Sequence, residues 1–304
     1  MTKENGMETL NVNQNLVSPT TNTTPSISSS AMLVELNISL WTGRKFDKNV
    51  SQEIDTQKNA TTRAGNYHKK LFADEPKFEA ITKFAGSART THYYQTMPWS
   101  DSGLRLLTTP LFFEYNKKMT EADAEFNRLV SEFIADYDNM IARAHTKLGN
   151  LFNPEDYPSI DEVADKYHFR LKYSPVPEVG DFRVDVGTDA LKQLNESYAN
   201  YYQEQLNNAY KDVWQRTYDA LKSMSDRLAG DNKQIFRDTL VTNVTGIVEL
   251  LDKFNVTNDE AMRKAKFKIT DALKGITPDA LREDDYLRHD TKRKVDELLK
   301  EFTW

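Results

Sequence analysis

The feature that most constrains this chain is a run of apolar residues at helical spacing between residues 119 and 148. Steps of three and four residues over this length predict one long amphipathic helix, which Gly149 ends. A second run of this kind extends from Leu191 to Leu228 and is long enough to lie antiparallel to the first. With only 11 Gly and 10 Pro in 304 residues, regular structure is rarely interrupted. We therefore expect a mainly α fold dominated by long antiparallel helices in a coiled-coil-like hairpin.

A small β element is predicted beside these helices. Apolar and polar residues alternate over 32–40, which predicts a half-buried strand. Alternation also occurs on both sides of a proline-containing loop within 168–187, which predicts a β-hairpin that pairs with the first strand. Residues 48–95 predict a helical hairpin that starts after Asp47, with its second helix starting at Pro76. Further helix starts are predicted at two caps, the pair Ser159 and Glu162 and the single residue Thr277.

The chain divides into three segments by composition. Residues 1–30 contain sixteen Ser, Thr or Asn and almost nothing to bury, so we expect a disordered N-terminal tail. Residues 31–118 are expected to hold the first strand and a basic, aromatic-rich helical hairpin. Residues 119–304 are expected to form a helical domain that contains the β-hairpin at about 168–187, with later helices at about 231–254, 258–274 and 278–302.

Several classes of protein are excluded by residue content. The chain has no cysteine, so it has no disulfide and no thiolate site. No apolar run reaches the roughly 18 residues that a membrane-spanning helix needs, and the N-terminus lacks the layout of a signal peptide. We therefore expect a cytoplasmic protein without membrane contact.

The search for catalytic chemistry is mostly negative. Glycine-rich phosphate loops are absent, and none of the five histidines has a second ligand at zinc spacing. Asp181 and Asp185 flank Arg183 and would share one strand face, which leaves a metal-dependent enzyme as a weak alternative. A solvated strand face neutralised by Arg183 is the favoured interpretation. We assign no catalytic, cofactor-binding or metal-binding residue, and we expect no cofactor.

A basic and aromatic segment is the one positive signal. Residues 41–118 carry thirteen Lys or Arg against eight Asp or Glu, whereas the whole chain has a net charge of −6. Proteins that hold single-stranded nucleic acid combine a cationic groove with aromatic rings on which bases stack. Packing of these aromatic residues in a core is the competing interpretation. The candidate surface for nucleic acid or a protein partner comprises Arg44, Arg63, Lys69, Lys70, Lys83, Arg89, Tyr93, Tyr94, Trp99 and Arg105.

Three stretches carry a family resemblance: "LNISLWTGRKFDKNVSQEI", "MPWSDSGLRLL" and "PVPEVGDFRVDVG". With them the chain, from about residue 31 on, resembles an uncharacterised family of tailed bacteriophages and prophages with no assigned activity. Members of similar families are often encoded near a MoxR-like AAA+ ATPase and a von Willebrand factor A-type protein, which implies an adaptor role in the host cytoplasm. The most distinctive positions are interpreted as a structural signature at turns and corners: Trp41, Gly43, Pro98, Gly180, Asp181, Phe182 and Arg183.

Two functions from different classes remain open at this point. The leading prediction is a non-enzymatic interaction protein that presents helical surfaces to a protein partner, which the resemblance suggests is the AAA+ ATPase or the von Willebrand factor A-type protein, or to a second copy of itself. The alternative is an accessory protein that binds single-stranded nucleic acid through the surface of residues 41–118.

Overall fold

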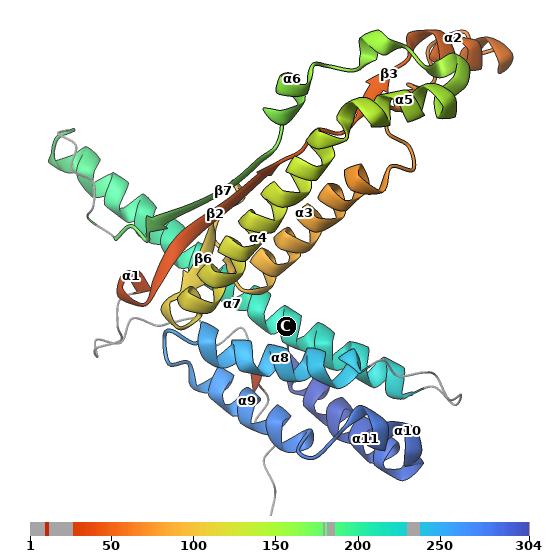
Figure 1. Ribbon diagram of the computed structural model, residues 1–304. Coiled ribbons are helices and arrows are strands. Elements are labelled where there is room, and N and C mark those ends of the chain that lie inside the picture. Colours follow the sequence, from red (N-terminus) through yellow and green to blue (C-terminus); the bar gives the residue numbers. More distant parts are fainter. Residues whose placement is uncertain (1–9, 12–26, 179, 181–185, 230–237, 304) are drawn as a thin grey trace, which may run out of the picture. The chain divides into compact units, whose positions relative to one another are not determined.

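The computed structural model describes residues 10–11, 27–178, 180, 186–229 and 238–303. Within them it is rich in helix, as expected, and has a small antiparallel sheet (Figure 1). The chain forms two compact units. Unit 1 comprises Met1–Glu35, Gln95–Phe113 and Tyr173–Trp304, and unit 2 comprises Leu36–Tyr94 and Glu114–Lys172. The units therefore interleave along the chain, whereas the composition divides it at residue 118.

The helices of the described residues have the following bounds: α1 Ile27–Ser30, α2 Lys48–Gln57, α3 Pro76–Tyr94, α4 Thr109–Ala135, α5 Tyr137–Leu148, α6 Ile160–Ala164, α7 Thr188–Leu228, α8 Thr239–Phe254, α9 Glu260–Ala272, α10 Pro278–Glu283 and α11 Asp285–Lys300. The strands are β1 Leu10–Asn11, β2 Ala31–Ser39, β3 Arg44–Phe46, β4 His68–Lys70, β5 Met97–Pro98, β6 Arg105–Thr108, β7 His168–Pro175 and β8 Phe302–Thr303. Two short 3-10 turns lie at Gly149–Leu151 and Pro154–Asp156.

The predicted strand at 32–40 is confirmed as β2. It lies between β6 and β7 in a four-stranded sheet of order β5-β6-β2-β7. The antiparallel register with β6 pairs Ala31 with Thr108 and Val34 with Arg105. Val34 and Ile38 are buried as the alternation predicts, but Leu33 on the opposite face is buried too. The predicted pairing of the first strand with 168–175 is present, while the second strand of the predicted β-hairpin falls largely on 181–185, outside the described residues.

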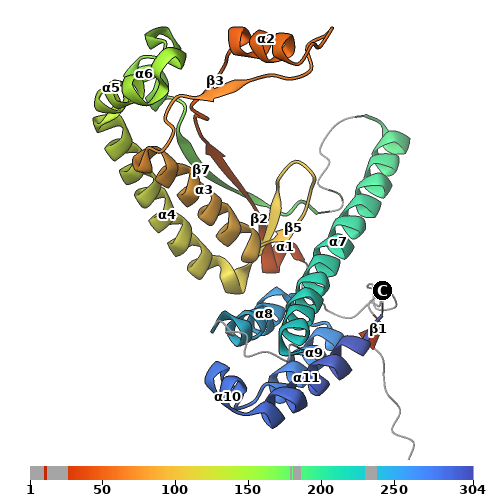
Figure 2. The ribbon, with the colours of Figure 1, turned by 90° about the vertical axis from the view of Figure 1, so that its right-hand side faces the viewer.

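Unit 1 contains the helices of the C-terminal part of the chain. Its longest helix, α7, packs against α8 and α11, and α9 packs against α8 and α11 (Figure 2). Apolar residues of α7 at steps of three and four are buried from Leu206 to Leu228, which follows the predicted periodicity. Strand β8 pairs with β1, and its Phe302 lies edge-on against Trp214 of α7 with ring centroids 5.8 Å apart.

Unit 2 is formed around helices α3 and α4, which lie side by side (Figures 1 and 2). Its core joins Ile81, Ala85 and Ala88 of α3 to Phe126 and Phe133 of α4. Aromatic rings fill one end of this core, where Phe72 contacts Trp41, Phe78, Phe133 and Tyr137 at centroid distances of 5.6 to 5.9 Å. Rings at these separations and mostly edge-on angles add to the stability from buried area alone.

Three predictions about helices are wrong in detail. The expected long helix of residues 119–148 is broken into α4 and α5 at Asp136, whose backbone leaves the helical region with φ −108° and ψ 6°. The Asp136 carboxylate accepts hydrogen bonds from Asn139 and Arg143 and pairs with Lys77. The expected helical hairpin at 48–95 contains only α2 and α3; between them the chain runs through a loop and strand β4. The final predicted helix, 278–302, is likewise divided at Asp284, which caps α11.

The predicted caps are confirmed. Asp47 accepts hydrogen bonds from the amides of Asn49 and Val50 at 3.1 Å, and Ser159 with Glu162 forms the capping box of α6. Thr277 accepts from the amide of Ala280. The predicted helix at 231–254 is present as α8 from Thr239 to Phe254, and the predicted residues 231–237 lie outside the described residues. The antiparallel pairing of the two long helices stays a prediction, because α4 and α7 belong largely to different units. The predicted disordered tail at 1–30 falls mostly outside the described residues. Where it is described the prediction is wrong, because Leu10–Asn11 form β1 and Ile27–Ser30 form α1 with Ile27 buried.

Candidate cationic and aromatic site of unit 2

Strands β3 and β4 form a short antiparallel pair at one end of unit 2, although α2 lies between them in the chain. We call this strand pair the hairpin. Its register pairs Arg44 with Lys70, Lys45 with Lys69 and Phe46 with His68. Because side chains alternate along a strand and directly paired residues share a face, Arg44, Phe46, His68 and Lys70 lie on one face and Lys45 and Lys69 on the other. All four residues of the first set are exposed. We call this set the hairpin surface.

Gly43 precedes β3 at a position where only glycine fits. Gly43 has φ +57°, a left-handed conformation that side chains other than glycine rarely adopt. A Cβ atom at this position would lie 2.6 Å from Cζ of Phe78, too close for any real contact. The carbonyl of Gly43 accepts a hydrogen bond of 2.8 Å from the amide of Leu71, which extends the pairing of the two strands. The predicted structural role of Gly43 is therefore present in the structure.

Aromatic and cationic groups gather at the far end of the hairpin surface. The ring of Phe46 is 39% exposed and lies 5.5 Å, centroid to centroid, from the ring of His68. The guanidinium carbon of Arg63 lies 5.5 Å from the centroid of the Phe46 ring, within the range of a cation–π contact. A predicted residue, Arg63, is thus joined to two residues that the sequence analysis did not select.

Lys69 does not belong to the hairpin surface, so its prediction as a surface cation is wrong. Its side chain is only 7% exposed, and its Nζ lies 2.6 Å from Asp156 and 3.5 Å from Asp47. It also donates to the carbonyl of Leu151 at 2.8 Å. The physical reason is the strand alternation, which turns Lys69 inward and Lys70 outward. The pKa of Asp47 is lowered, mainly by the hydrogen bond from the Val50 amide and also by Lys69.

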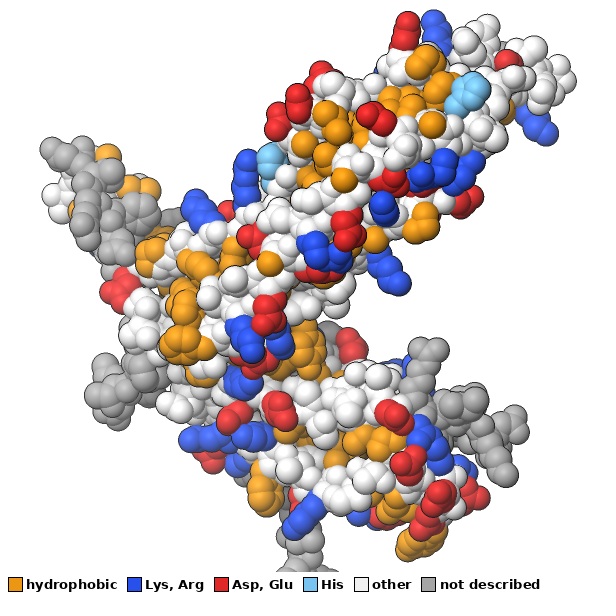
Figure 3. Space-filling view, in the orientation of Figure 1, with side chains coloured by type: hydrophobic (Ala, Val, Ile, Leu, Met, Phe, Trp, Pro, Cys, Tyr) orange, Lys and Arg blue, Asp and Glu red, His pale blue; other side chains and the backbone are white. Residues whose placement is uncertain are grey.

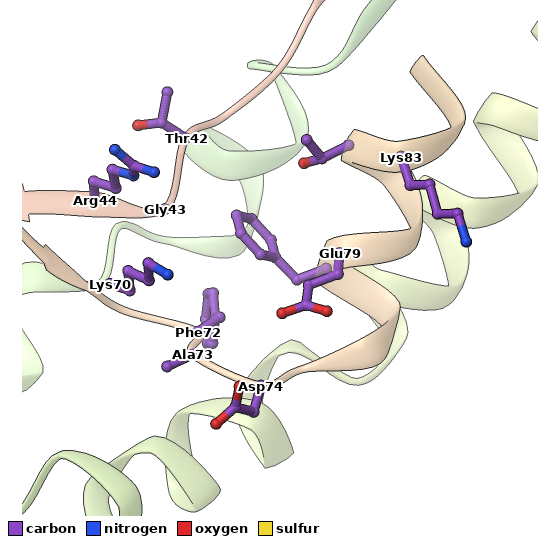
Figure 4. A pocket seen from close by; sticks show the side chains of 11 residues that line it. Thr42, Gly43, Arg44, Lys70, Phe72, Ala73, Asp74, Glu79 and Lys83 are labelled. Atoms are coloured by element: carbon purple, nitrogen blue, oxygen red, sulfur yellow. The ribbon is translucent and has the colours of Figure 1, made fainter. Parts of the chain in front are cut away.

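A pocket of about 370 Å³ adjoins the hairpin surface (Figure 4). Arg44 and Lys70 line it from the hairpin, and Phe72 and Phe78 provide aromatic lining. Asp74 and Glu79 line the side next to α3, and the Glu79 carboxylate turns toward the hairpin while Lys83 extends away from it (Figure 4). Arg44, Lys70, Asp74 and Glu79 form no ion pair with a described residue. The pocket therefore has an apolar lining with Arg44 and Lys70 on one side, and with Asp74, Glu79 and the outward-turned Lys83 on the other.

A buried carboxylate holds the loop that forms one wall of the pocket. Glu75 is buried and binds Nη2 of Arg143 at 2.7 Å and Nζ of Lys147 at 2.9 Å. Lys147 also donates to the carbonyl of Asp74 at 3.0 Å. These cations lower the pKa of Glu75, the hydrogen bond from Arg143 having the largest effect. The wall is thus fixed by charged contacts, and the ligand-facing groups of the pocket are left uncommitted.

The remaining predicted surface residues are dispersed. Arg89 donates to the carbonyl of Ile38 at 2.8 Å, which satisfies a backbone acceptor of β2. Tyr93 and Tyr94 are 52% and 42% exposed at the end of α3, where their neighbour His92 is buried and bonds the hydroxyl of Tyr115 at 2.7 Å. The structure therefore exposes both tyrosines.

Two predicted residues belong to unit 1 and take no part in the site. Trp99 is buried, with its ring edge-on against Tyr202 of α7 at 5.4 Å, so its prediction as an exposed stacking residue is wrong and the core interpretation holds. Arg105 donates to the side chain and carbonyl of Thr96 at 2.6 and 2.9 Å. Its guanidinium is used to fix the chain around β5 and β6, the strand pair to which Pro98 also contributes.

The other described residues of the predicted structural signature lie at turns and corners of the chain. Trp41 lies edge-on against Phe72 and Phe78, at 5.7 and 6.2 Å. Gly180 has φ +102°. Asp181, Phe182, Arg183 and Asp185 lie outside the described residues, so nothing is assigned to the predicted metal alternative. In the described part of the chain, no three His, Asp or Glu side chains gather as a metal site.

Sequence reasoning missed four functional candidates: Phe46, His68, Asp74 and Glu79. The signal for the first two was present in "GRKFD" and "YHKK", where a cation and a ring alternate on both strands. It was overlooked because the residues before Asp47 were interpreted as leading into a helix, and 48–95 as a helical hairpin. Asp74 and Glu79 depend on the way the chain folds back after β4, which no local pattern indicates.

Comparison with known proteins gives no relative for this chain. No family model, no curated protein and no solved structure matches it. The resemblance to a phage and prophage family therefore stays a prediction. No helix among the described residues is long and apolar enough to cross a membrane.

Proposed function

We propose that this protein is a non-enzymatic interaction protein that binds a protein partner through the hairpin surface and adjoining pocket of unit 2. The observation that supports this function is the pocket: an aromatic lining between two cations, Arg44 and Lys70, and two carboxylates, Asp74 and Glu79, none of which forms an ion pair with a described residue. A polypeptide offers apolar side chains together with both signs of charge, so it matches every wall of this pocket.

The surface proposed to bind the partner is not the one that the sequence predicts. The sequence predicts helical surfaces, whereas the uncommitted charges lie on a β-hairpin and on the first turn of α3. The outer face of α4 carries Lys or Arg beside Asp or Glu, as Figure 3 shows, and its pairs Arg128 with Glu125 and Glu132 already satisfy one another. A MoxR-like AAA+ ATPase, a von Willebrand factor A-type protein or a second copy of the chain are the partner identities that the sequence predicts, and a coiled-coil pairing of the long helices remains proposed with them.

Site-directed photocrosslinking tests the function. A photoreactive phenylalanine analogue at position 46 is expected to form a covalent adduct with one protein in an extract of native cells, identified by mass spectrometry. The adduct should disappear in the variant Arg44→Glu/Lys70→Glu and persist in Lys45→Glu, because Lys45 lies on the opposite face of the same hairpin. Adducts that form equally in both variants would contradict the proposal.

Single-stranded nucleic acid is the second candidate partner, and one observation favours it. The exposed rings of Phe46 and His68 lie beside Arg44, Lys70 and Arg63, which is the combination of stacking and phosphate-binding groups that such proteins use. The carboxylates of Asp74 and Glu79 oppose a purely anionic strand. A labelled 20-nucleotide strand whose binding falls steeply with salt, and is lost in Arg44→Glu/Lys70→Glu, would favour this candidate over a protein partner.

A further inference from the structure

The pocket of unit 2 has a polarity that restricts what can occupy it. Arg44 and Lys70 reach it from β3 and β4, and Asp74 and Glu79 reach it from the loop after β4 and the first turn of α3. Lys83 also lines the pocket from α3, but its side chain extends away from the two strands (Figure 4). Phe72, which is buried, and the half-buried Phe78 lie between these two pairs. An occupant with one sign of charge is therefore attracted by one side and repelled by the other.

The volume fits one large side chain with its flanking residues. About 370 Å³ lies at the lower end of the range for pockets that bind compact ligands. The aromatic lining is prearranged, because Phe72 and Phe78 also contact Trp41 and Phe133 in the core. The wall at Asp74 is fixed by Lys147. Such a rigid recess loses little conformational entropy when it is filled.

We infer that this pocket binds a linear peptide segment in which an aromatic side chain stands between an acidic residue and a basic residue. The aromatic side chain occupies the space against Phe72 and Phe78. The acidic neighbour lies toward Arg44 and Lys70, and the basic neighbour lies toward Asp74 and Glu79. This inference rests on the proposed function, for which it names the recognised segment.

Fluorescence anisotropy with designed probe peptides tests the inference on the full chain. Labelled twelve-residue peptides of Gly and Ser carry one of five central sequences: Asp-Phe-Lys, Lys-Phe-Asp, Asp-Phe-Asp, Lys-Phe-Lys or Asp-Gly-Lys. At least one of the two mixed-charge peptides with Phe is expected to bind about tenfold more tightly than the other three. Equal binding of Asp-Phe-Asp, or no binding of either mixed-charge peptide, overturns the inference.

Charge-reversal variants provide a sharper form of the test. Lys70→Glu is expected to move the preference to Lys-Phe-Lys, and Glu79→Lys is expected to move it to Asp-Phe-Asp. Lys45→Glu is the matched control, since it makes the same charge change on the opposite face of the hairpin and should leave the order unchanged. All three side chains are exposed, so folding should be unaffected. A control that changes the order as much as Lys70→Glu overturns the inference.

A glycine variant tests the aromatic part of the pocket separately. In Gly43→Ala the new Cβ displaces the ring of Phe78, so the mixed-charge peptide should lose most of its affinity. Gly86→Ala is the control, because Gly86 is exposed on α3 with nothing within 4 Å of its added Cβ. Unchanged binding in Gly43→Ala, with near-ultraviolet circular dichroism showing a native fold, contradicts an aromatic occupant.

The remaining outcomes separate this inference from the proposed function. If free phenylalanine or a dT20 strand displaces the probe peptide at equal concentration, a small zwitterion or a nucleic acid is the better occupant and the inference fails. If no probe peptide binds while the crosslink at position 46 still requires Arg44 and Lys70, only the inference fails. If that crosslink also fails, the proposed function fails with it.

Discussion

The two units bury different chemistry in their interiors. In unit 1 the packed helices α7, α8 and α11 bury mainly aliphatic residues, such as Val213, Leu221 and Leu251, together with the charged side chain of Arg288. In unit 2 the interior combines aromatic rings with two buried charges, Lys69 and Glu75. Helices satisfy their own backbone groups, whereas loops leave carbonyls that need partners. Lys69 and Lys147 supply such partners at Leu151, Ala73 and Asp74. The difference shows that unit 2 uses buried charge to hold its irregular segments in place.

The largest expected effect comes from removing a buried charge in unit 2. Lys69→Met leaves Asp47 and Asp156 without their shared cation and should lower the free energy of unfolding of unit 2 by about 3–5 kcal/mol. Hydrogen exchange measured by mass spectrometry would follow each unit by its own peptides. Leu221→Ala is the counterpart, expected to lower the stability of unit 1 by about 2–5 kcal/mol. Equal loss of protection in both units after either change would contradict the comparison.

Acid should weaken unit 2 at a higher pH than unit 1, where Asp290 and Asp296, whose pKa is also lowered, have unfolded-state values of 3.8. The pKa of Glu75 is lowered, mainly by the hydrogen bond from Arg143, and that of Asp136 is lowered to about 2, with Asn139 as the largest cause. A carboxylate with a lowered pKa in the folded state stabilises the protein above its unfolded-state value, here 4.5 for Glu75. That stability is lost as the pH falls through the folded-state pKa. Protection of unit 2 peptides should therefore decline below about pH 4.5.

The variant Glu75→Gln is the control for this pH dependence. It should be less stable than the natural protein at pH 7, because Arg143 and Lys147 lose their carboxylate. The difference between the two proteins should shrink as the pH falls, since Glu75 itself becomes protonated. A constant difference between pH 7 and pH 3 would show that the charge of Glu75 does not contribute.

Caps should have a moderate effect that is similar in both units. Ser159→Ala removes the capping box of α6 in unit 2, and Thr277→Ala removes the cap of α10 in unit 1. Each change should cost about 1 kcal/mol in the free energy of unfolding of its own unit, measured by urea denaturation with hydrogen exchange as the local probe. If Ser159→Ala lowered the free energy of unfolding as much as Lys69→Met, α6 would contribute more to the stability of unit 2 than its buried contacts indicate.

The smallest effect is expected for surface ion pairs of unit 1. Arg293 lies 2.7 Å from Asp290 and 2.8 Å from Glu297 on α11, and its side chain is 59% exposed. Solvent and salt screen such pairs, so Arg293→Ala should leave the stability of unit 1 almost unchanged. The thermal midpoint in low and high salt provides the measurement. A large loss of stability that does not depend on salt would contradict the comparison, because it would show that exposed charges stabilise unit 1 as strongly as buried charges stabilise unit 2.

Much of the fold could be predicted from the sequence because its helices carry their own signals. The periodic runs in α4 and α7, the caps at Asp47, Ser159 and Thr277, and the alternation in β2 all depend on neighbours within a few residues. The breaks at Asp136 and Asp284 were missed, because an aspartate among the polar residues of a helical pattern does not by itself indicate a helix end. Asp136 pairs with Lys77 and Arg143, and Asp284 caps α11.

The candidate site was predicted only in part, for a related reason. Arg44, Lys70 and Arg63 were selected by charge and composition, and the structure brings Arg44 and Lys70 together through three backbone-paired positions. Trp99 and Arg105 were grouped with them because they are near in sequence, yet they contact Tyr202 and Thr96 in unit 1. Because the two units alternate along the chain, residues that are close in sequence can belong to different units.

Lys69 and Lys70 show that the role of a lysine in β4 depends on the face of the strand on which it lies. They are chemically identical neighbours, yet one neutralises two carboxylates inside unit 2 and the other faces the pocket. A slip of one residue in the pairing with β3 would exchange their roles and turn His68 and Phe46 to opposite faces. The buried pairing of Lys69 thus acts as a check on strand register: only the correct alignment satisfies Asp47 and Asp156 while leaving the binding groups outward.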